Sequence, residues 1–345
     1  MLNINLTYRT RRRLRRLGIV SGSLLLAAVV IFACWFVWLE RFVVYTSDGV
    51  RLDFDYTSPG GTAQVAEPPT NETVAIHYNE GDETINASLE LTQIQGYYVT
   101  TDMFTASVDN VRSTIQQLPA GSAVMLDLKS PQGKFFYTSG LSNAPISTGL
   151  DVTQVDQLIK DLDSTNIYLI ARVPAFRDMA YGLENTTCGL AHSSGKYLWS
   201  DELGCYWLNP TSSGALNWLI TIANELKGLG FDEVVFTEFC FPATTQIIFD
   251  SNMTQQEALE AAAETLVTSC ATSRFAVSFE STNASFRIPE GRSRLYLAGV
   301  EAAQAADVAG TTTVADKAIN LVMLTETNDT RFDAFSVMRP MPVPN

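Results

Sequence analysis

The chain has 345 residues, of which 46% are hydrophobic, and a formal net charge of −14 at pH 7. This length and apolar content allow one large domain or two small domains with a sizeable core. All six basic residues before residue 40 are arginines, and the remaining residues hold 17 basic and 37 acidic side chains, a net charge of −20. So acidic a domain is excluded as a nucleic-acid binder that neutralises phosphates.

The N-terminus has the pattern of a membrane anchor. Six arginines lie within residues 1–16, and an uncharged run follows from Leu17 to Leu39. That run is long enough to cross a bilayer of roughly 30 Å, and Trp35 and Trp38 lie at its far end, where aromatic belts form. The positive-inside rule predicts a cytoplasmic tail at 1–16, a single transmembrane helix at 17–39 and an extracellular remainder. A cleaved signal peptide is the alternative, but no small-residue cleavage site follows the apolar run.

Residues 40–92 are predicted to form an extracellular hairpin and spacer. Apolar and polar residues alternate from Phe42 to Tyr56 around Ser47-Asp48-Gly49, which is typical of a hairpin. The segment from Thr57 to Thr92 is rich in Pro, Gly, Thr, Asn and Glu, as in a linker, and contains one candidate strand at Val74–Tyr78.

Residues 93–345 alternate between strand and helix patterns. The expected strands are Gly96–Thr100, Ser122–Lys129, Asn166–Val173, one centred on Val234 within Gly230–Pro242, Phe275–Glu280, Asp307–Thr311, Ile319–Glu326 and Ala334–Met338. The expected helices are Val108–Leu118, Val152–Leu162, Gly214–Leu229, Gln255–Thr268 and Arg292–Ala306. Repeated β–α alternation means parallel pairing, and about eight units favour a TIM-like (β/α)8 barrel. The region after Thr311 is short for two units, which predicts an irregular C-terminal end.

Polar residues follow many of these strands, and a closed barrel would gather them at one mouth. The predicted catalytic carboxylates are Glu238 and Glu280, with Glu326 as the third choice. The predicted substrate-binding residues are Asp127, Lys129, Arg172, Trp199, Tyr206 and Trp207. Aromatic faces cover the apolar faces of a pyranose, and two carboxylates flanking one bond can hydrolyse it by acid/base catalysis. Two other interpretations stay open: Asp127 forms a structural ion pair with Lys129 or Arg172, and Glu238 is a solvated residue at a strand end.

Four sequence blocks resemble the glycoside hydrolase-like family DUF4015, a TIM-barrel family of bacterial envelope proteins. They are AVMLDLKSPQGKFFY, IYLIARVPAFRD, LWSDELGCYWLNP and GFDEVVFTEFCFP, and together they cover roughly Gly96 to Pro242. The resemblance implies a polysaccharide or cell-wall glycan as the substrate and no cofactor. It also places Asp127, Lys129, Gly133, Arg172 and Asp178 on motif positions.

The last block departs from the family pattern at two charged positions. The family's aspartate falls on Thr237 and its arginine on Cys240, while Glu238 falls on a tyrosine position. A carboxylate is kept at Glu280, where the family has a shorter aspartate. Since neighbouring strand residues point to opposite faces, Glu238 replaces the lost aspartate only if the strand end bends. These changes indicate altered or lost hydrolysis.

Three functions follow from this pattern. The first is a membrane-anchored extracellular glycoside hydrolase that acts on a cell-wall or other polysaccharide. The second is a catalytically degenerate barrel that binds a glycan or an envelope partner, and the third is a purely structural domain. Cys188 and Cys205 flank a loop and are candidates for a disulfide outside the cell. With two histidines and no CxxC motif, the sequence predicts no metal site.

Overall fold

The computed structural model describes residues 43–46, 49–52, 90–142 and 144–342. The chain divides into two compact units, Met1–His77 and Tyr78–Asn345. In the first unit, β1 (Val43–Thr46) and β2 (Gly49–Leu52) pair antiparallel, which confirms the predicted hairpin. The predicted transmembrane helix at 17–39 and nearly all of the predicted spacer lie outside the described residues. Within the described ranges, no helix has the length and apolar character needed to span a bilayer.

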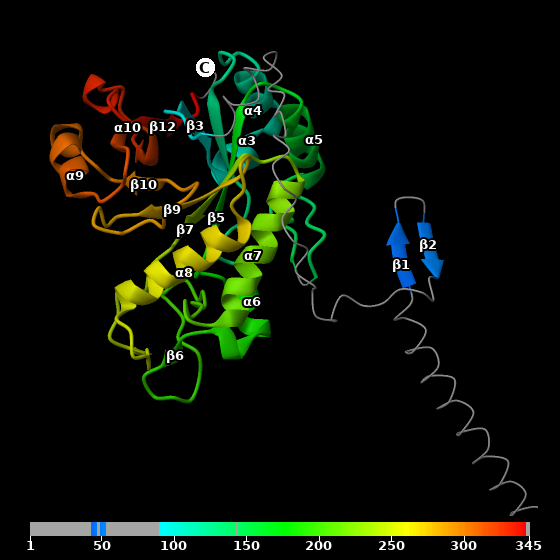
Figure 1. Ribbon diagram of the computed structural model, residues 1–345, viewed down its shortest axis with the longest axis vertical. Helices are drawn as coiled ribbons and strands as arrows, with labels where there is room; N and C mark the ends of the chain where they lie inside the picture. Colours follow the sequence, from blue (N-terminus) through cyan, green and yellow to red (C-terminus); the bar gives the residue numbers. More distant parts are fainter. Residues whose placement is uncertain (1–42, 47–48, 53–89, 143, 343–345) are drawn as a thin grey trace, which may run out of the picture. The chain divides into compact units, whose positions relative to one another are not determined.

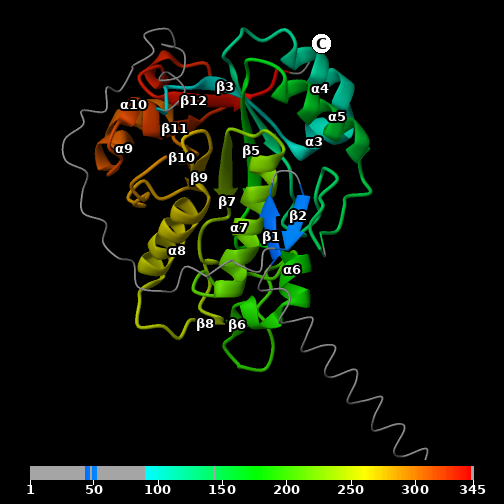
Figure 2. The same ribbon diagram turned by 45° about the vertical axis from the view of Figure 1, so that its right-hand side comes forward.

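The second unit is a closed barrel of eight parallel strands, as the sequence predicts (Figures 1 and 2). Its strands in order around the barrel are β3 (Gln95–Val99), β4 (Ala123–Asp127), β5 (Tyr168–Pro174), β7 (Glu233–Thr237), β9 (Ala276–Ser281), β10 (Leu295–Ala298), β11 (Leu321–Leu324) and β12 (Ser336–Pro340). The ring closes where β12 pairs in parallel with β3. All eight C-terminal strand ends therefore meet at one end of the barrel, called the mouth below.

Helices pack around the outside of the barrel. They are α3 (Thr101–Ala106), α4 (Val108–Ile115), α5 (Val152–Asp163), α7 (Ser213–Gly228), α8 (Gln255–Cys270), α9 (Ala305–Thr311) and α10 (Lys317–Asn320). Both views place α4 and α5 on the opposite side of the barrel from α9 and α10 (Figures 1 and 2). The longer helices begin at side-chain caps, for example the capping box of Thr254 and Glu257 at α8.

The prediction for residues 292–311 is wrong. The expected helix Arg292–Ala306 begins as strand β10, and the expected strand Asp307–Thr311 belongs to helix α9. Residues 294–298 alternate between the barrel interior and the surrounding helices, which is a strand pattern, whereas residues 302–309 are rich in alanine, which favours helix. A single helix predicted over residues 292–306 therefore combines a strand-like segment with a helical one, and the strand pattern is lost in the average. The strand count stays at eight because β10 replaces the misplaced strand.

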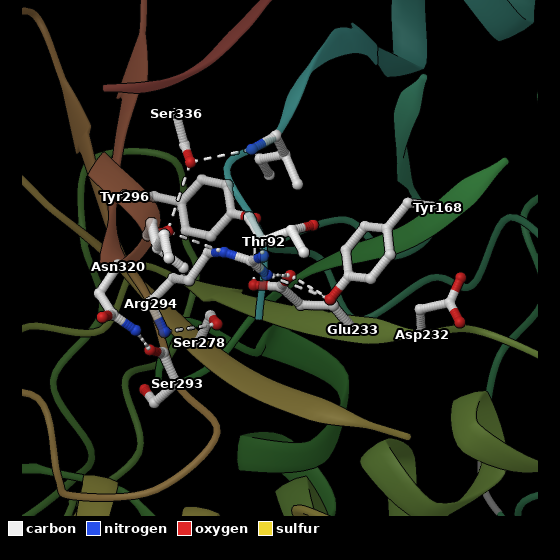
Figure 3. Close-up of polar contacts among 12 residues, drawn as sticks. Thr92, Tyr168, Asp232, Glu233, Ser278, Ser293, Arg294, Tyr296, Asn320 and Ser336 are labelled. Carbon is white, nitrogen blue, oxygen red and sulfur yellow. Dashed lines mark hydrogen bonds and ion pairs between the residues drawn. The ribbon is translucent and has the colours of Figure 1, made fainter. Parts of the chain in front are cut away.

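The middle of the barrel interior is apolar, with Met125, Ile170, Val235, Val322 and Met338 in one buried cluster. Below it, at the end away from the mouth, lies a buried ion pair between Arg294 and Glu233, with both side chains 0% exposed. The Tyr168 hydroxyl donates to Glu233 at 2.9 Å, and the Tyr296 hydroxyl donates to its other oxygen at 3.0 Å. Arg294 also donates to the backbone oxygens of Thr92 and Ile319, so each of its three side-chain nitrogens has an acceptor (Figure 3).

Two long loops stand on one side of the mouth. The excursion after β5 contains α6 (Met179–Glu184) and β6 (Ala191–His192), and the loop after β7 contains β8 (Ile247–Ile248). Strands β6 and β8 pair antiparallel. This pairing joins the two loops into one wall beside the barrel mouth.

Candidate active site

Arg172 lies at the centre of the mouth and binds two of the predicted site residues. Its Nε and one terminal nitrogen donate to the two oxygens of Glu280 at 2.8 and 3.1 Å, a bidentate pair that reaches across β7. Its other terminal nitrogen donates to Asp127 at 3.0 Å, and Asp127 also accepts from the Thr101 backbone N–H at 3.3 Å. The predicted residues Asp127, Arg172 and Glu280 thus form one network.

Burial sets the protonation behaviour of this network. Desolvation raises the pKa of Asp127, and the contacts with Arg172 oppose that increase only in part. Desolvation by itself would lower the pKa of Arg172, but the Glu280 and Asp127 carboxylates outweigh it and raise the pKa overall. The guanidinium therefore stays charged, and its bidentate contact fixes the orientation of the Glu280 carboxylate. The alternative of a structural ion pair holds for Asp127, which lines neither of the two mouth cavities around Arg172 and Glu280 that are described below.

The end of β7 bends, which is the condition under which Glu238 can take part in the site. Glu238 has φ = 50° and is the one non-glycine residue with positive φ in the described part of the chain. A left-handed residue is uncommon outside glycine, and such outliers cluster at functional sites. The bend directs the carboxylate toward Arg177, whose Nη1 donates to it at 3.3 Å. Thr237, on the family's aspartate position, precedes Glu238 and is buried, and both residues line one cavity at the mouth, which is described below.

Arg177 connects the mouth to the excursion after β5. Its Nε donates to Asp201 at 2.6 Å, and its guanidinium lies 6.0 Å from the centre of the Trp207 ring. Asp201 also accepts from the Trp207 indole at 3.2 Å and from the backbone N–H groups of Leu203 and Cys205. Burial alone would raise the pKa of Asp201, but the hydrogen bonds from Arg177, the backbone and Trp207 lower it overall. Asp201 therefore organises the loop as an ionised acceptor.

Two cavities meet at the Arg172–Glu280 pair. The first has a volume of about 660 Å³ and is lined by the loops after β10 and β11, with Tyr98 and Glu326. The second has a volume of about 440 Å³ and is lined by Thr237, Glu238, Phe241 and the start of α8. Glu280 and Arg172 line both. The three predicted carboxylates therefore face cavities at the mouth, and Glu280 is the one that both cavities share.

Glu326 and Tyr98 differ from Asp127, Arg172 and Glu280 in having no fixed partner. Within the described ranges, neither side chain makes a hydrogen bond or an ion pair, and Glu326 is exposed. Burial raises the pKa of Tyr98, and the nearby Glu326 carboxylate raises it further. Tyr98 lies two residues after Gly96 on β3, so both point to the inner face of the barrel.

The family assignment follows from comparison with known sequences. A model of the family DUF4015, described as "Putative glycosyl hydrolase domain", matches residues 96–286. The chain belongs to this family. No curated protein matches the sequence.

Comparison with solved structures finds likenesses to this DUF4015 domain. The alpha-galactosidase from Lactobacillus brevis has a TM-score of 0.51 and 10% identity, over 74% of this chain and 38% of its own. A hypothetical protein from Ruminiclostridium thermocellum has a TM-score of 0.43 and 20% identity, over 53% of this chain and 96% of its own. The GH20 exo beta-N-acetylglucosaminidase from Vibrio harveyi has a TM-score of 0.45 and 10% identity, over 67% of this chain and 41% of its own. At 10% identity the likeness to the alpha-galactosidase concerns the fold alone, and this chain spans less than half the length of the two glycosidases.

Lys129 does not lie in the mouth of the DUF4015 barrel, contrary to the prediction. Strand β4 ends at Asp127, and the chain then turns, so Lys129 is buried and its Nζ lies 2.7 Å from Asp178. Asp178 also accepts from the Trp218 indole at 3.0 Å and from the backbone N–H of Tyr181. Gly133 packs against Asp178 with no room for a Cβ. These motif residues fasten the loop after β4 to α6 and α7, and none of them can reach a substrate in the mouth.

The three predicted aromatic platforms of the DUF4015 domain are dispersed. Trp207 is 7% exposed and is held by Asp201, so it supports the loop. Trp199 is half-buried and lines a hollow with Asp201 and residues 243–246. Tyr206 lines a different hollow, with Leu183 and Tyr197. None of the three lines the two cavities that meet at Glu280.

The predicted disulfide between Cys188 and Cys205 is not formed in the structure, where both are buried free thiols. The Cys188 sulfur packs against Gly214 at the start of α7. Cys205 belongs to the loop around Asp201, where burial and then the Asp201 charge raise the pKa of its thiol. The two side chains therefore have separate surroundings. Among the residues that the structure describes, no group of three His, Cys, Asp or Glu side chains is arranged to hold a metal ion.

Proposed function

We propose that the chain is a glycoside hydrolase, anchored in the membrane by residues 17–39, that acts outside the cell on a cell-wall or other polysaccharide. The observation that carries this proposal is the position of Glu280, which faces two cavities at the C-terminal end of a TIM-like barrel. Active sites of such barrels lie at this end. The family description supports the reaction class.

Glu280 is proposed as the nucleophile or base. The bidentate contact with Arg172 fixes its orientation, while each oxygen keeps a lone pair for the substrate or a water. Hydrolysis also needs a carboxylic acid that protonates the leaving oxygen. Glu326 suits this role better than Glu238, because the Glu238 carboxylate is ion-paired with Arg177, whereas Glu326 has no cation partner among the described residues.

The first experiment measures new reducing ends from purified cell-wall glycan and a panel of polysaccharides. The full-length protein is compared with Glu280→Gln, Glu326→Gln and Glu238→Gln. We expect the first two to lose activity by roughly 10²–10⁴-fold, the usual contribution of general acid/base groups. If Glu238→Gln lost activity and Glu326→Gln kept it, the role of general acid would pass from Glu326 to Glu238. No release from any glycan by the wild type would overturn the hydrolase.

The second candidate function is a barrel that binds glycan without cleaving it. Thr237 favours this function, because it stands on the family's aspartate position and lines the second cavity. Retention of the wild-type protein on an insoluble glycan, with no reducing ends released, would support it. A Thr237→Asp variant gives the sharper test, since activity gained by that change would show that the missing carboxylate limits catalysis.

The anchored topology is supported by the sequence alone, through the arginines at 9–16 and the apolar run at 17–39. It predicts that protease added outside intact cells digests the C-terminal domain and spares a tag at residue 1. Protection of the domain under those conditions would contradict the extracellular placement.

A further inference from the structure

We infer that this site binds sugar units on both sides of the bond it cleaves, so its substrate is a glycan chain cut at internal linkages. The inference rests on the proposed hydrolysis at Glu280. It follows from two separate cavities that share Glu280 and Arg172 and have no other lining residue in common.

The first cavity offers contacts for one side of the chain. Its apolar surface comes from Met125, Leu324 and the Tyr98 ring, and its polar groups include the Tyr98 hydroxyl, Thr327 and Glu326. The Tyr98 hydroxyl has no partner among the described residues, so it is available to a ligand. A volume of about 660 Å³ lies within the range of roughly 300–1,000 Å³ that holds a drug-sized ligand.

The second cavity offers an independent set of contacts. It is lined by the bent end of β7, by Gln255 and Gln256 at the start of α8, by Ser281 at the end of β9 and by Asn283 after it. Phe241 supplies an aromatic surface, and its ring is fixed by an edge contact with Phe249 at 4.8 Å. Amide, hydroxyl and aromatic groups are the chemistry that binds neutral sugars. A volume of about 440 Å³ is again sufficient for a ligand.

The geometry places the reacting carboxylate between these two sets of contacts. An enzyme that removes one terminal sugar from any leaving group needs binding energy on one side of the bond. Here the loops after β10 and β11 form one side, and the loops after β7 and β9 form the other. A ligand that fills both cavities passes Glu280 with at least one sugar on each side. Residues 243–246, which follow Phe241 in the chain, line another hollow of about 830 Å³ together with Trp199.

Charge restricts the kind of chain. The first cavity has four carboxylates, Glu280, Glu301, Glu326 and Asp329, against the two cations Arg172 and Arg331. The second has Glu238 and Glu280 against Arg172, and Arg177 pairs with Glu238 from outside the lining. The excess negative charge of the first cavity repels a polyanion. The substrate is therefore a chain without a high density of acidic groups.

The test follows product size against time on neutral polysaccharides and on a polyuronate, with the full-length protein in detergent. We expect early products of mixed length and a rapid fall in polymer length, on a neutral chain in preference to the polyuronate. A single small product with the polymer length almost unchanged would overturn internal cleavage and leave the hydrolase intact. Preference for the polyuronate would overturn the charge argument. No cleavage of any polymer would overturn the proposed function itself.

Variants in each cavity test whether both sides bind. Tyr98→Phe removes one hydroxyl from the first cavity, and Gln255→Ala removes one exposed amide from the second. Each is expected to lower kcat/KM on the chain by roughly three- to ten-fold, the effect of one hydrogen bond. Gln157→Ala on the exposed face of α5 is the matched control and should change nothing. An effect from one cavity only would mean that the substrate is bound on one side, which contradicts the inference.

Discussion

The barrel has an arginine–carboxylate network at each of its two ends, and the two differ in what surrounds them. At the closed end, Arg294 and Glu233 are 0% exposed, and two tyrosine hydroxyls and two backbone oxygens complete their hydrogen bonds. At the mouth, the Arg172 side chain is 26% exposed and the Glu280 side chain 16%, and both face cavities.

The difference shows that an ion pair in a barrel does not indicate its role by itself. A fully enclosed pair is costly to form and costly to break, because removing one partner leaves a buried charge. A pair at a cavity keeps part of its hydrogen-bonding capacity for a ligand. The closed end is therefore expected to govern stability and the mouth to govern chemistry, and the following substitutions test that division.

The largest expected effect is on activity. Glu280→Gln should lower hydrolysis by roughly 10²–10⁴-fold. The free energy of unfolding should change by less than about 1 kcal/mol, because Arg172 keeps Asp127 and an amide oxygen as acceptors. Initial rates of reducing-end release and urea unfolding measure the two quantities. Severe destabilisation of this variant would show that the mouth network is structural.

A glutamate-to-glutamine substitution at the closed end should lower stability and leave activity unchanged. Glu233→Gln leaves the buried Arg294 charge uncompensated and should lower the free energy of unfolding by about 3–5 kcal/mol. The remaining folded protein should hydrolyse at the wild-type rate. In a double-mutant cycle with Arg294→Met, the double variant should be less destabilised than the sum of the single variants. Additive effects would contradict direct coupling of the two side chains.

Lys129 provides an intermediate case, since the sequence predicted a binding role and the structure shows a buried pair. Lys129→Met should cost about 3 kcal/mol of unfolding free energy, because Asp178 loses its cation. KM should stay constant, since the side chain is paired with Asp178 and lines neither mouth cavity. A raised KM at constant stability would restore the predicted binding role.

The smallest effect concerns the pH dependence of stability. The pKa of Asp127 is raised in the folded state, chiefly by burial, so the native protein binds more protons than the unfolded chain between the ordinary and the raised pKa. Stability due to this group is therefore highest at low pH and falls as the pH rises through that interval. Asp127→Asn should remove this slope, an effect on the order of 1 kcal/mol, as for most single substitutions. Urea unfolding at a series of pH values measures it, and equal slopes in both proteins between about pH 3 and 7 would contradict the assignment.

The sequence was sufficient for the barrel because each strand–helix unit has its own local period. It also located Asp127, Arg172 and Glu280 together, since charged residues at strand ends of a closed parallel barrel converge. The strand around Tyr296 was missed because its inward Arg294 is stabilised by Glu233, 61 residues earlier in the chain. The sequence around Arg294 contains no pattern from which Glu233 could be predicted as its partner.

The loops were the other source of error, and the reason is also physical. The place of Lys129 depends on where β4 ends, and that of Trp207 depends on its hydrogen bond to Asp201. Motif residues in the excursion after β5 look like a binding surface because they are aromatic and charged. In the structure several of them form hydrogen bonds with one another instead, as Arg177 and Trp207 do with Asp201. The sequence predicted that Glu238 can take part in the site only if the strand end bends, but it could not predict the bend, which depends on one backbone angle.

The pairing of β12 with β3 has a consequence for biosynthesis. Arg339 on β12 follows Gln95 on β3 by 244 residues, although the two strands are neighbours in the ring. A growing chain therefore completes its ring only after Ser336–Pro340 has left the ribosome, and until then the edge of β3 has no neighbour. Premature termination before Ser336 would leave an open sheet with an unpaired edge, the form most prone to aggregate.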